Sequence, residues 1–265
     1  MQGRSRYKKT KVVQKKKTGL KKISGRFLNI VLLVLVISSP YLVMKSPFMK
    51  VKNIKVLGAE SVNDQKIVDD VKNFASSTKY FLPAANILLI NKSDLSALIL
   101  KDFPSIRNVE IVKKFSRNLE ITVTENSRDF LWCISESNCF NMDKSGLIFS
   151  KYSSAAEDGQ KLIFKGNISG NPIQKSFASP EKMKNFADSV KIFEDQDLKI
   201  KFINMSSDNE AVFSSDIGSI ILNPEDDLRM SAENTLVFID EMKSKNPDIH
   251  FSYIDARYGN KIFYR

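Results

Sequence analysis

The 265-residue sequence contains few of the residues that catalytic and metal sites usually need. His250 is its single histidine, which excludes a metal site built on several imidazoles. Because His250 stands beside Phe251 without an evident partner, we expect it to be structural or at the surface. The ten glycines are scattered singly, so there is no glycine-rich phosphate loop, and two cysteines are too few to hold a metal ion. We therefore predict no enzymatic activity, no cofactor, no metal and no small-molecule substrate.

Paired acidic residues do not change this prediction. Asp69-Asp70 and Asp226-Asp227 are neighbours in sequence. In a helix, adjacent side chains point about 100° apart, so neither pair converges on one substrate atom. We expect solvated or helix-capping roles for these carboxylates, and no pattern favours a Ser–Lys catalytic pair.

Acidic residues are absent from residues 1–26, which contain eleven Lys or Arg. The apolar run Phe27–Met44 follows, and as a helix its 18 residues would span about 27 Å, against about 30 Å for a bilayer core. Short basic segments stay on the cytoplasmic side of a membrane. The sequence thus predicts a basic cytoplasmic tail at 1–26, a transmembrane helix at 27–44 in the lipid bilayer, and extracytoplasmic residues beyond it.

A cleaved signal peptide with an apolar core at Phe27–Ile37 is the alternative. The long basic head and the sequence Ser38–Tyr41, which lacks a small-x-small cleavage pattern, favour the uncleaved anchor. Outside the head, 30 basic residues balance the 30 acidic ones, so the net charge of +11 comes from the head. It is no evidence for nucleic-acid binding, which needs basic residues clustered on a folded face.

The first exported segment has the pattern strand, helix, helix, strand, strand. Val51–Gly58 alternates like a strand, and Ser61, three residues before an acidic residue, predicts the start of an amphipathic helix. A second helical pattern opens at Ser93 and stops before Pro104. The runs 109–112 and 119–123 are rich in strand formers and predict a hairpin.

The second half of the chain predicts a mostly antiparallel sheet with helices on one side. We expect helices from Pro180 and from Pro224 to Ser244. Strand patterns occur at 129–134, 139–141, 147–149, 198–203, 211–213, 217–222, 249–257 and 261–264. We expect Trp132, the only tryptophan, to anchor the core of this part.

Cys133 and Cys139 flank an expected four-residue turn, Ser135–Asn138, outside the membrane. An oxidising compartment would permit a disulfide between them. Direct pairing across such a turn would place Ile134 opposite Cys139, so the disulfide needs a β-bulge. A disulfide and two free thiols therefore both stay open.

Taken in order, these features resemble the FtsQ/DivIB family of bacterial cell-division proteins. The resemblance rests on the basic head, the single crossing, Trp132 and four motifs: VKNIKVLG at 51–58, FPSIRNVEIVKKFSRNLEITVTEN at 103–126, MDKSGLIF at 142–149 and YIDARYGNKIFYR at 253–265. It implies an α+β fold with a POTRA domain at 48–125 and a C-terminal β domain at 126–265. Ser116 departs from the family, which often has a proline there, and Asn126 stands where a basic residue is usual.

The resemblance also implies partners. In this family, small bitopic proteins of the FtsB/DivIC and FtsL types dock on the closing strands, and an exposed strand edge permits such strand addition. Tyr258 is the best candidate contact, and its strand context is Arg257, Gly259, Asn260, Lys261, Ile262 and Phe263. The alternative for Arg257 is that it closes the sheet by pairing with Asp255 across strands.

The resulting hypothesis is a non-enzymatic membrane scaffold that links other division proteins at the septum. One alternative is a POTRA-bearing accessory for protein export or membrane insertion. Another is an anchored cell-wall enzyme, which the missing catalytic residues disfavour.

Overall fold

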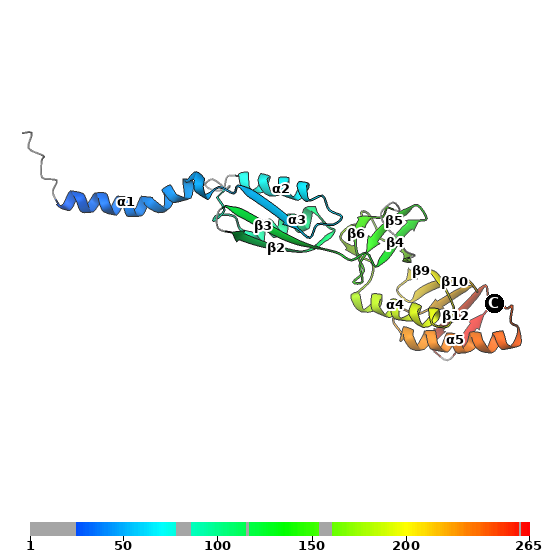
Figure 1. Ribbon diagram of the computed structural model, residues 1–265. Helices are drawn as coiled ribbons and strands as arrows, with labels where there is room; N and C mark the ends of the chain where they lie inside the picture. Colours follow the sequence, from blue (N-terminus) through cyan, green and yellow to red (C-terminus); the bar gives the residue numbers. More distant parts are fainter. Residues whose placement is uncertain (1–24, 78–85, 115–116, 154–160, 260) are drawn as a thin grey trace, which may run out of the picture.

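The computed structural model describes residues 25–77, 86–114, 117–153, 161–259 and 261–265. The chain is elongated: helix α1 (Gly25–Lys45) and the short 3-10 helix η1 (Pro47–Met49) lead into two successive α+β units (Figure 1). The mixed α+β class is as predicted.

The first unit contains β1 (Asn53–Leu57), α2 (Asp64–Ser76), α3 (Lys92–Asp102), β2 (Ile106–Lys114) and β3 (Asn118–Glu125). This order confirms the predicted strand, helix, helix, strand, strand pattern. Its sheet has the order β1-β3-β2, in which β1 is parallel and β2 antiparallel to β3. Apolar side chains of both helices and the sheet form its own core, including Ile67, Val71, Leu95, Ile99, Leu119 and Ile121.

The prediction that Ser61 caps the first helix is wrong. Asn63 is the N-cap of α2, and its Oδ1 accepts hydrogen bonds from the backbone N–H groups of Gln65 (2.9 Å) and Lys66 (3.4 Å). Likewise, α3 begins at Lys92 after the N-cap Asn91, one residue before the predicted opening. Ser61 instead donates its hydroxyl to Glu125.

Glu125 joins the end of β3 to the loop between β1 and α2. Its Oε1 accepts from the backbone N–H groups of Glu60 (2.8 Å), Ser61 (2.9 Å) and Val62 (3.1 Å). Burial alone would raise the pKa of Glu125, but the hydrogen bonds from the Ser61 side chain and from these three N–H groups outweigh it and lower the pKa. The ionised carboxylate therefore stabilises this loop.

We expect Glu125→Ala to lower the free energy of unfolding by about 1–2 kcal/mol at neutral pH, because charge-assisted hydrogen bonds are lost at a partly exposed site. The folded-state pKa of Glu125 is lowered, so its contribution is present above the unfolded pKa of about 4.3 and is lost as pH falls through the folded value. Urea denaturation of the full chain at neutral and acidic pH measures both the loss of stability and its dependence on pH. Glu110→Ala on β2, an exposed position, is the control; equal loss in the two variants would contradict the prediction.

The second unit is built on a ten-stranded sheet of order β13-β12-β11-β10-β9-β7-β4-β5-β6-β8. The strands are β4 (Phe130–Ser135), β5 (Asn138–Met142), β6 (Leu147–Lys151), β7 (Leu162–Gly166), β8 (Lys175–Ser176), β9 (Ile200–Ser207), β10 (Glu210–Ser215), β11 (Ser219–Leu222), β12 (Tyr253–Tyr258) and β13 (Lys261–Tyr264). The sequence patterns predicted most of these strands but missed β7 and β8.

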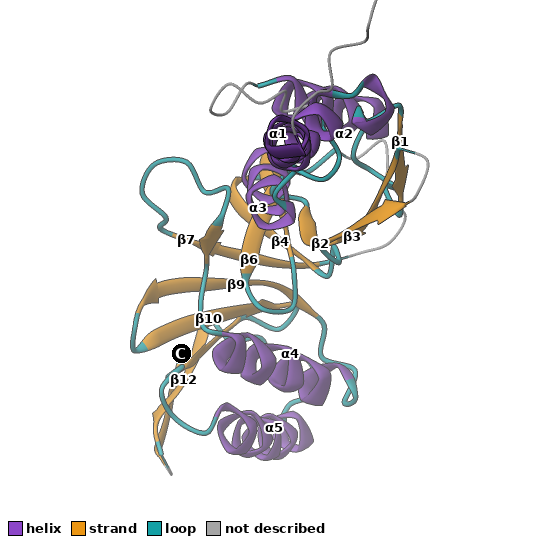
Figure 2. Cartoon of the chain, turned by 90° about the vertical axis from the view of Figure 1, so that its left-hand side faces the viewer, coloured by secondary structure: helices purple, strands orange, loops and turns teal. Residues whose placement is uncertain are grey.

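The sheet is mostly antiparallel, as predicted, but three of its nine neighbouring pairs are parallel: β4–β7, β7–β9 and β11–β12. Helices α4 (Pro180–Glu194) and α5 (Leu228–Lys245) account for two of them. The chain runs from β7 through β8 and α4 to β9, and from β11 through α5 to β12. Crossovers of this kind return the chain in its original direction, so the strands before and after them are parallel. Both helices lie on the same side of the sheet (Figure 2).

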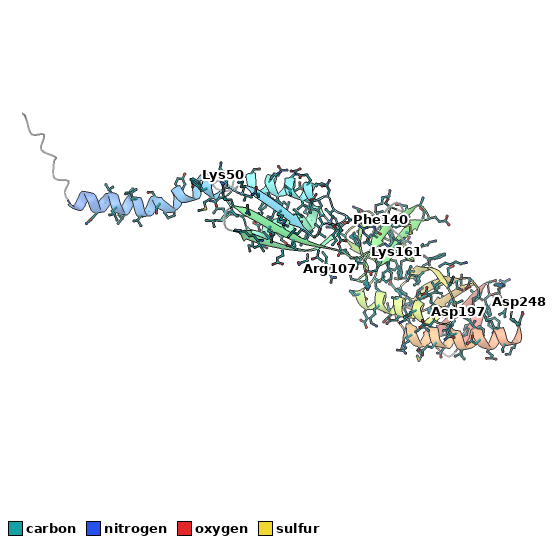
Figure 3. All side chains as sticks on the ribbon, viewed as in Figure 1. Lys50, Arg107, Phe140, Lys161, Asp197 and Asp248 are labelled. Carbon is teal, nitrogen blue, oxygen red and sulfur yellow. A yellow bond between two sulfur atoms is a disulfide. The ribbon has the colours of Figure 1, made fainter. Side chains whose placement is uncertain are left out.

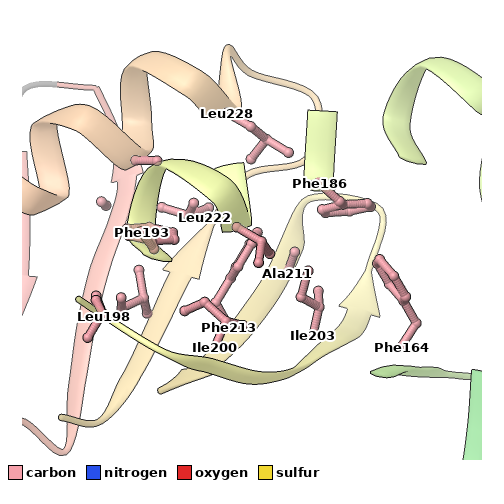
Figure 4. Close-up of a cluster of buried hydrophobic side chains, with 14 of the residues drawn as sticks. Phe164, Phe186, Phe193, Leu198, Ile200, Ile203, Ala211, Phe213, Leu222 and Leu228 are labelled. Atoms are coloured by element: carbon pink, nitrogen blue, oxygen red, sulfur yellow. The ribbon is translucent and has the colours of Figure 1, made fainter. Parts of the chain in front are cut away.

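Phenylalanine side chains form the centre of the second core (Figure 4). The ring of Phe186 lies 5.8 Å from that of Phe164 and 6.1 Å from that of Phe213, and Phe213 lies 5.9 Å from Phe193. Trp132 is 1% exposed and belongs to this core, which confirms its predicted role.

The β4–β5 hairpin contains a disulfide between Cys133 and Cys139, whose Cα atoms are 4.1 Å apart. The two cysteines pair directly across the strands, and Ser135 pairs with Asn138. The register shifts between Cys133 and Ser135, so Ile134 is the extra residue of a bulge. This bulge brings the cysteines into register. Because Ser135 pairs with Asn138, the turn of the hairpin is shorter than the predicted four-residue turn.

Helix α1 covers the segment predicted to cross the membrane. Over the part of the chain that the structure describes, no helix has both the length and the apolar character that a membrane crossing requires. The predicted basic tail lies outside the described residues, except for Gly25 and Arg26.

Candidate partner-binding strands

Strands β12 and β13 form one end of the ten-stranded sheet. In the described sheet, β13 has β12 as its single neighbour, with Ile254 opposite Tyr264 and Asp255 opposite Phe263. The ladder continues to the last residue, since the backbone N–H of Arg265 donates to the carbonyl of Tyr253 (3.1 Å). The outer edge of β13 can therefore accept an added strand.

Only two residues, Gly259 and Asn260, separate the two strands in sequence. Tyr258 pairs with Lys261 on either side of them, and the register shifts between Asp255 and Tyr258. Gly259 has φ +63°, a conformation that favours glycine. Asn260, a predicted site residue, lies outside the described residues.

Alternate residues of β13 face opposite sides of the sheet. Tyr264 lies on the helix side, where its ring is 5.1 Å from that of Phe238 and 6.1 Å from that of Phe251. Ile262 also packs against the core. Of the predicted contact residues, Ile262 therefore anchors the strand, whereas Lys261 and Phe263 remain exposed.

Tyr258 and Phe263 form an exposed aromatic pair. Their side chains are 57% and 52% exposed, and their rings meet edge to face with centroids 5.6 Å apart. Together with Tyr253, Asp255 and Lys261 they line a shallow groove on the side of the sheet that faces away from α4 and α5. An exposed aromatic pair beside an open strand edge is typical of a protein-binding surface.

Arg257 fixes this end of the sheet through an ion-pair network. Its Nε lies 2.9 Å from Oδ1 of Asp255, one Nη lies 2.7 Å from Oδ2, and the other lies 2.6 Å from Oε2 of Glu210. The hydrogen bonds from Arg257 lower the pKa of the Asp255 carboxyl, and those to Asp255 raise the pKa of Arg257. The guanidinium also lies 5.5 Å from the centre of the Tyr258 ring.

The predicted Asp255–Arg257 pair exists, but not across strands. Both residues belong to β12, and residues two apart on a strand share one face. The cross-strand partner is Glu210 on β10, so the network bridges over the end of β11. Sequence reasoning missed Glu210 because it lies 47 residues from Arg257 and no local pattern connects the two.

Acidic groups elsewhere have the expected structural roles. Oδ1 of Asp227 accepts from the backbone N–H of Met230 (3.1 Å) and caps α5, and Asp69 pairs with Lys72 at an exposed position. Among the described residues, no three His, Cys, Asp or Glu side chains group closely enough to hold a metal ion.

Comparison with known proteins adds an identification of the first unit. Residues 49–126 match the family described as "POTRA domain, FtsQ-type". No curated protein matches the chain. The matched range contains β1, α2, α3, β2 and β3. The first unit is thus an FtsQ-type POTRA domain, and this match supports the assignment of the chain to the FtsQ/DivIB family of bacterial cell-division proteins.

Proposed function

We propose that the protein is a non-enzymatic membrane scaffold of the cell-division machinery, which gathers bitopic proteins of the FtsB/DivIC and FtsL types at the septum. One observation carries the proposal: in a chain with an FtsQ-type POTRA domain, β13 lies at an open edge of the described ten-stranded sheet, beside the exposed pair Tyr258 and Phe263.

The mechanism would be strand addition at β13. A partner strand would pair with the outer backbone groups of Lys261 to Tyr264 and gain affinity from hydrogen bonds. Specificity would come from side chains on the exposed face, chiefly Phe263 and Tyr258. Arg257 would act as a positioning residue, since its carboxylate partners hold it beside the Tyr258 ring.

Anchoring in the membrane is part of the proposal. It is supported by the apolar run Phe27–Met44 and by the basic residues that precede it. The apolar side chains from Ile30 to Ile37 on α1 are largely exposed, which suits a lipid environment. The cytoplasmic tail, the anchor at 27–44, the POTRA domain at 48–125 and the C-terminal β domain at 126–265 would then stand in order from the cytoplasm outward.

We expect Tyr258→Ala with Phe263→Ala to reduce the capture of FtsB/DivIC- and FtsL-type partners at least about tenfold. Hot-spot aromatic residues contribute roughly 2 kcal/mol or more each, so the loss of two should exceed that factor. The measurement is affinity capture of the tagged full chain from membranes, with partners quantified by mass spectrometry.

Val237→Ala is the matched control, because Val237 is an apolar residue that is 70% exposed on α5, on the other side of the sheet from the Tyr258–Phe263 pair. Capture unchanged in the double variant would move the binding site elsewhere. Recovery of export or membrane-insertion components in place of division proteins would instead favour the export-accessory hypothesis.

A further inference from the structure

The end of the POTRA domain nearest α1 carries a cluster of cations, which we name the basic end. The topology creates it: β1, α3 and β3 begin at this end, and β2 finishes there. Its cations are Lys50, Lys52, Lys92, Lys113, Lys114 and Arg117. Figure 3 shows Lys50 beside α1 and Arg107 at the opposite end of the domain.

Backbone and side-chain contacts hold these segments together. The N–H of Ile87 donates to the carbonyl of Met49 (2.8 Å), and that of Lys52 donates to Arg117 (2.9 Å). Nζ of Lys113 donates to the carbonyl of Leu88 (3.2 Å). Burial and the nearby charge of Lys92 lower the pKa of Lys113, as expected where cations crowd together.

The charge at the basic end is only partly balanced. Glu120 pairs with Lys114 at 2.5 Å, and Asp94 lies in the first turn of α3. Among the described residues of the basic end, six cations thus stand against two acidic side chains. The opposite end is nearly balanced, with Glu60, Asp64, Asp102 and Glu125 against Lys66, Lys101 and Arg107. The domain is therefore polarised along its length, with the positive end toward α1.

Two large apolar side chains stand exposed beside these cations. Phe48 in η1 is 77% exposed and Leu88 is 59% exposed. The segments that carry Phe48 and Leu88 are connected by the Lys50–Asn86 β-bridge and by the backbone hydrogen bond between Ile87 and Met49. Exposed apolar groups among Lys and Arg are the combination that binds the interfacial region of an anionic membrane.

Chain connectivity keeps this surface close to α1. Helix α1 ends at Lys45, and Lys50 is five residues further on. Even fully extended, five residues span at most about 18 Å. If α1 lies in a bilayer, the basic end lies within reach of the phospholipid headgroups.

We propose that the basic end binds anionic phospholipid headgroups, with Phe48 and Leu88 entering the interfacial layer, and thereby holds the POTRA domain in a defined orientation on the membrane. This inference rests on the membrane anchor of the proposed function. Cations attract anionic headgroups additively, and the two apolar side chains add a contact that free phosphate would not make.

The test places a fluorescent probe on the surface. The full chain with Leu88→Trp is reconstituted into vesicles of brominated phosphatidylcholine, with or without phosphatidylglycerol, and quenching of the introduced tryptophan is measured. Trp132 is buried, so the parent chain gives its background. We expect at least about twofold stronger quenching with phosphatidylglycerol, weakened by salt because screened charges attract less. Val237→Trp should show no dependence on phosphatidylglycerol.

Charge variants identify the residues responsible. Lys50→Gln, Lys52→Gln and Lys92→Gln together should abolish the phosphatidylglycerol-dependent quenching. The control removes the same amount of charge from three exposed lysines of the second unit, through Lys191→Gln, Lys199→Gln and Lys201→Gln. These changes should leave the phosphatidylglycerol-dependent quenching unchanged.

The outcomes separate this inference from the proposed anchor. If alkaline carbonate extracts the protein from vesicles, the anchor fails and this inference fails with it. If the protein is retained but its quenching is equal in both lipid mixtures, only the inference is overturned. If both triple variants lose the phosphatidylglycerol-dependent quenching equally, the attraction depends on overall charge, which would contradict a specific binding surface.

Discussion

Replacing Phe213 by alanine is expected to lower the free energy of unfolding of the second unit by about 3–5 kcal/mol. Phe213 is fully buried on β10, and its ring contacts those of Phe186 and Phe193. Alanine would remove its apolar contacts and leave a cavity between the sheet and α4. The neighbouring rings cannot collapse into that space without leaving their own packed positions.

Urea denaturation of the full chain in detergent, followed by circular dichroism, measures this loss. Phe263→Ala is the matched control, since the same residue type is 52% exposed on β13 and should cost less than about 1 kcal/mol. A loss below about 1 kcal/mol at Phe213 would show that the cluster in Figure 4 is not the stability centre of the unit.

Arg257→Ala is expected to cause the second large decrease in the free energy of unfolding. Arg257→Ala would leave the carboxylates of Asp255 and Glu210 side by side without their cation. Breaking a buried ion pair costs about 3–5 kcal/mol, and the partial exposure of this one reduces the expected loss to about 2–3 kcal/mol. The pKa of Asp255 is lowered in the folded state, so the loss should be present above its unfolded pKa and disappear as pH falls through the folded value.

A double-mutant cycle tests the network. Asp255→Asn removes the negative charge, so adding Arg257→Ala to it should cost less than Arg257→Ala alone. Additive losses would contradict a coupled pair. Because Arg257 also lies against the ring of Tyr258, Arg257→Ala should weaken partner capture, whereas Glu110→Ala should not.

Local patterns predicted much of the fold. Alternating apolar residues placed β1, β2 and β3, and helical spacing placed α2 and α3, because each of these elements buries a face against one core. The closing pair β12–β13 was predicted in the same way. Asp227 was expected to be solvated or to cap a helix, and it caps α5, but this helix begins at Leu228 and not at the predicted Pro224.

Predictions failed where one residue had two possible partners. Ser61 had the spacing of a helix cap, but Glu125, distant in sequence, takes its hydroxyl and Asn63 caps α2. The sequence indicated that a Cys133–Cys139 disulfide needs a bulge but left the disulfide open, and the structure contains both the bulge and the disulfide. Strand β7 was missed because it is a short apolar segment whose place between β4 and β9 depends on pairing with both.

The sequence by itself determined the order of elements in the first unit, the basic head with its apolar run, and the position of the closing strands, because periodicity and turn residues act over a few residues. The tertiary structure decided which strand became the open edge, that Ile262 faces the core while Phe263 is exposed, and that Glu210 joins Arg257. It also gathered cations from β2, from α3 and from the segments just before β1 and β3 at one end of the POTRA domain. These features depend on contacts between residues far apart in the chain, which exist only once the sheets have formed.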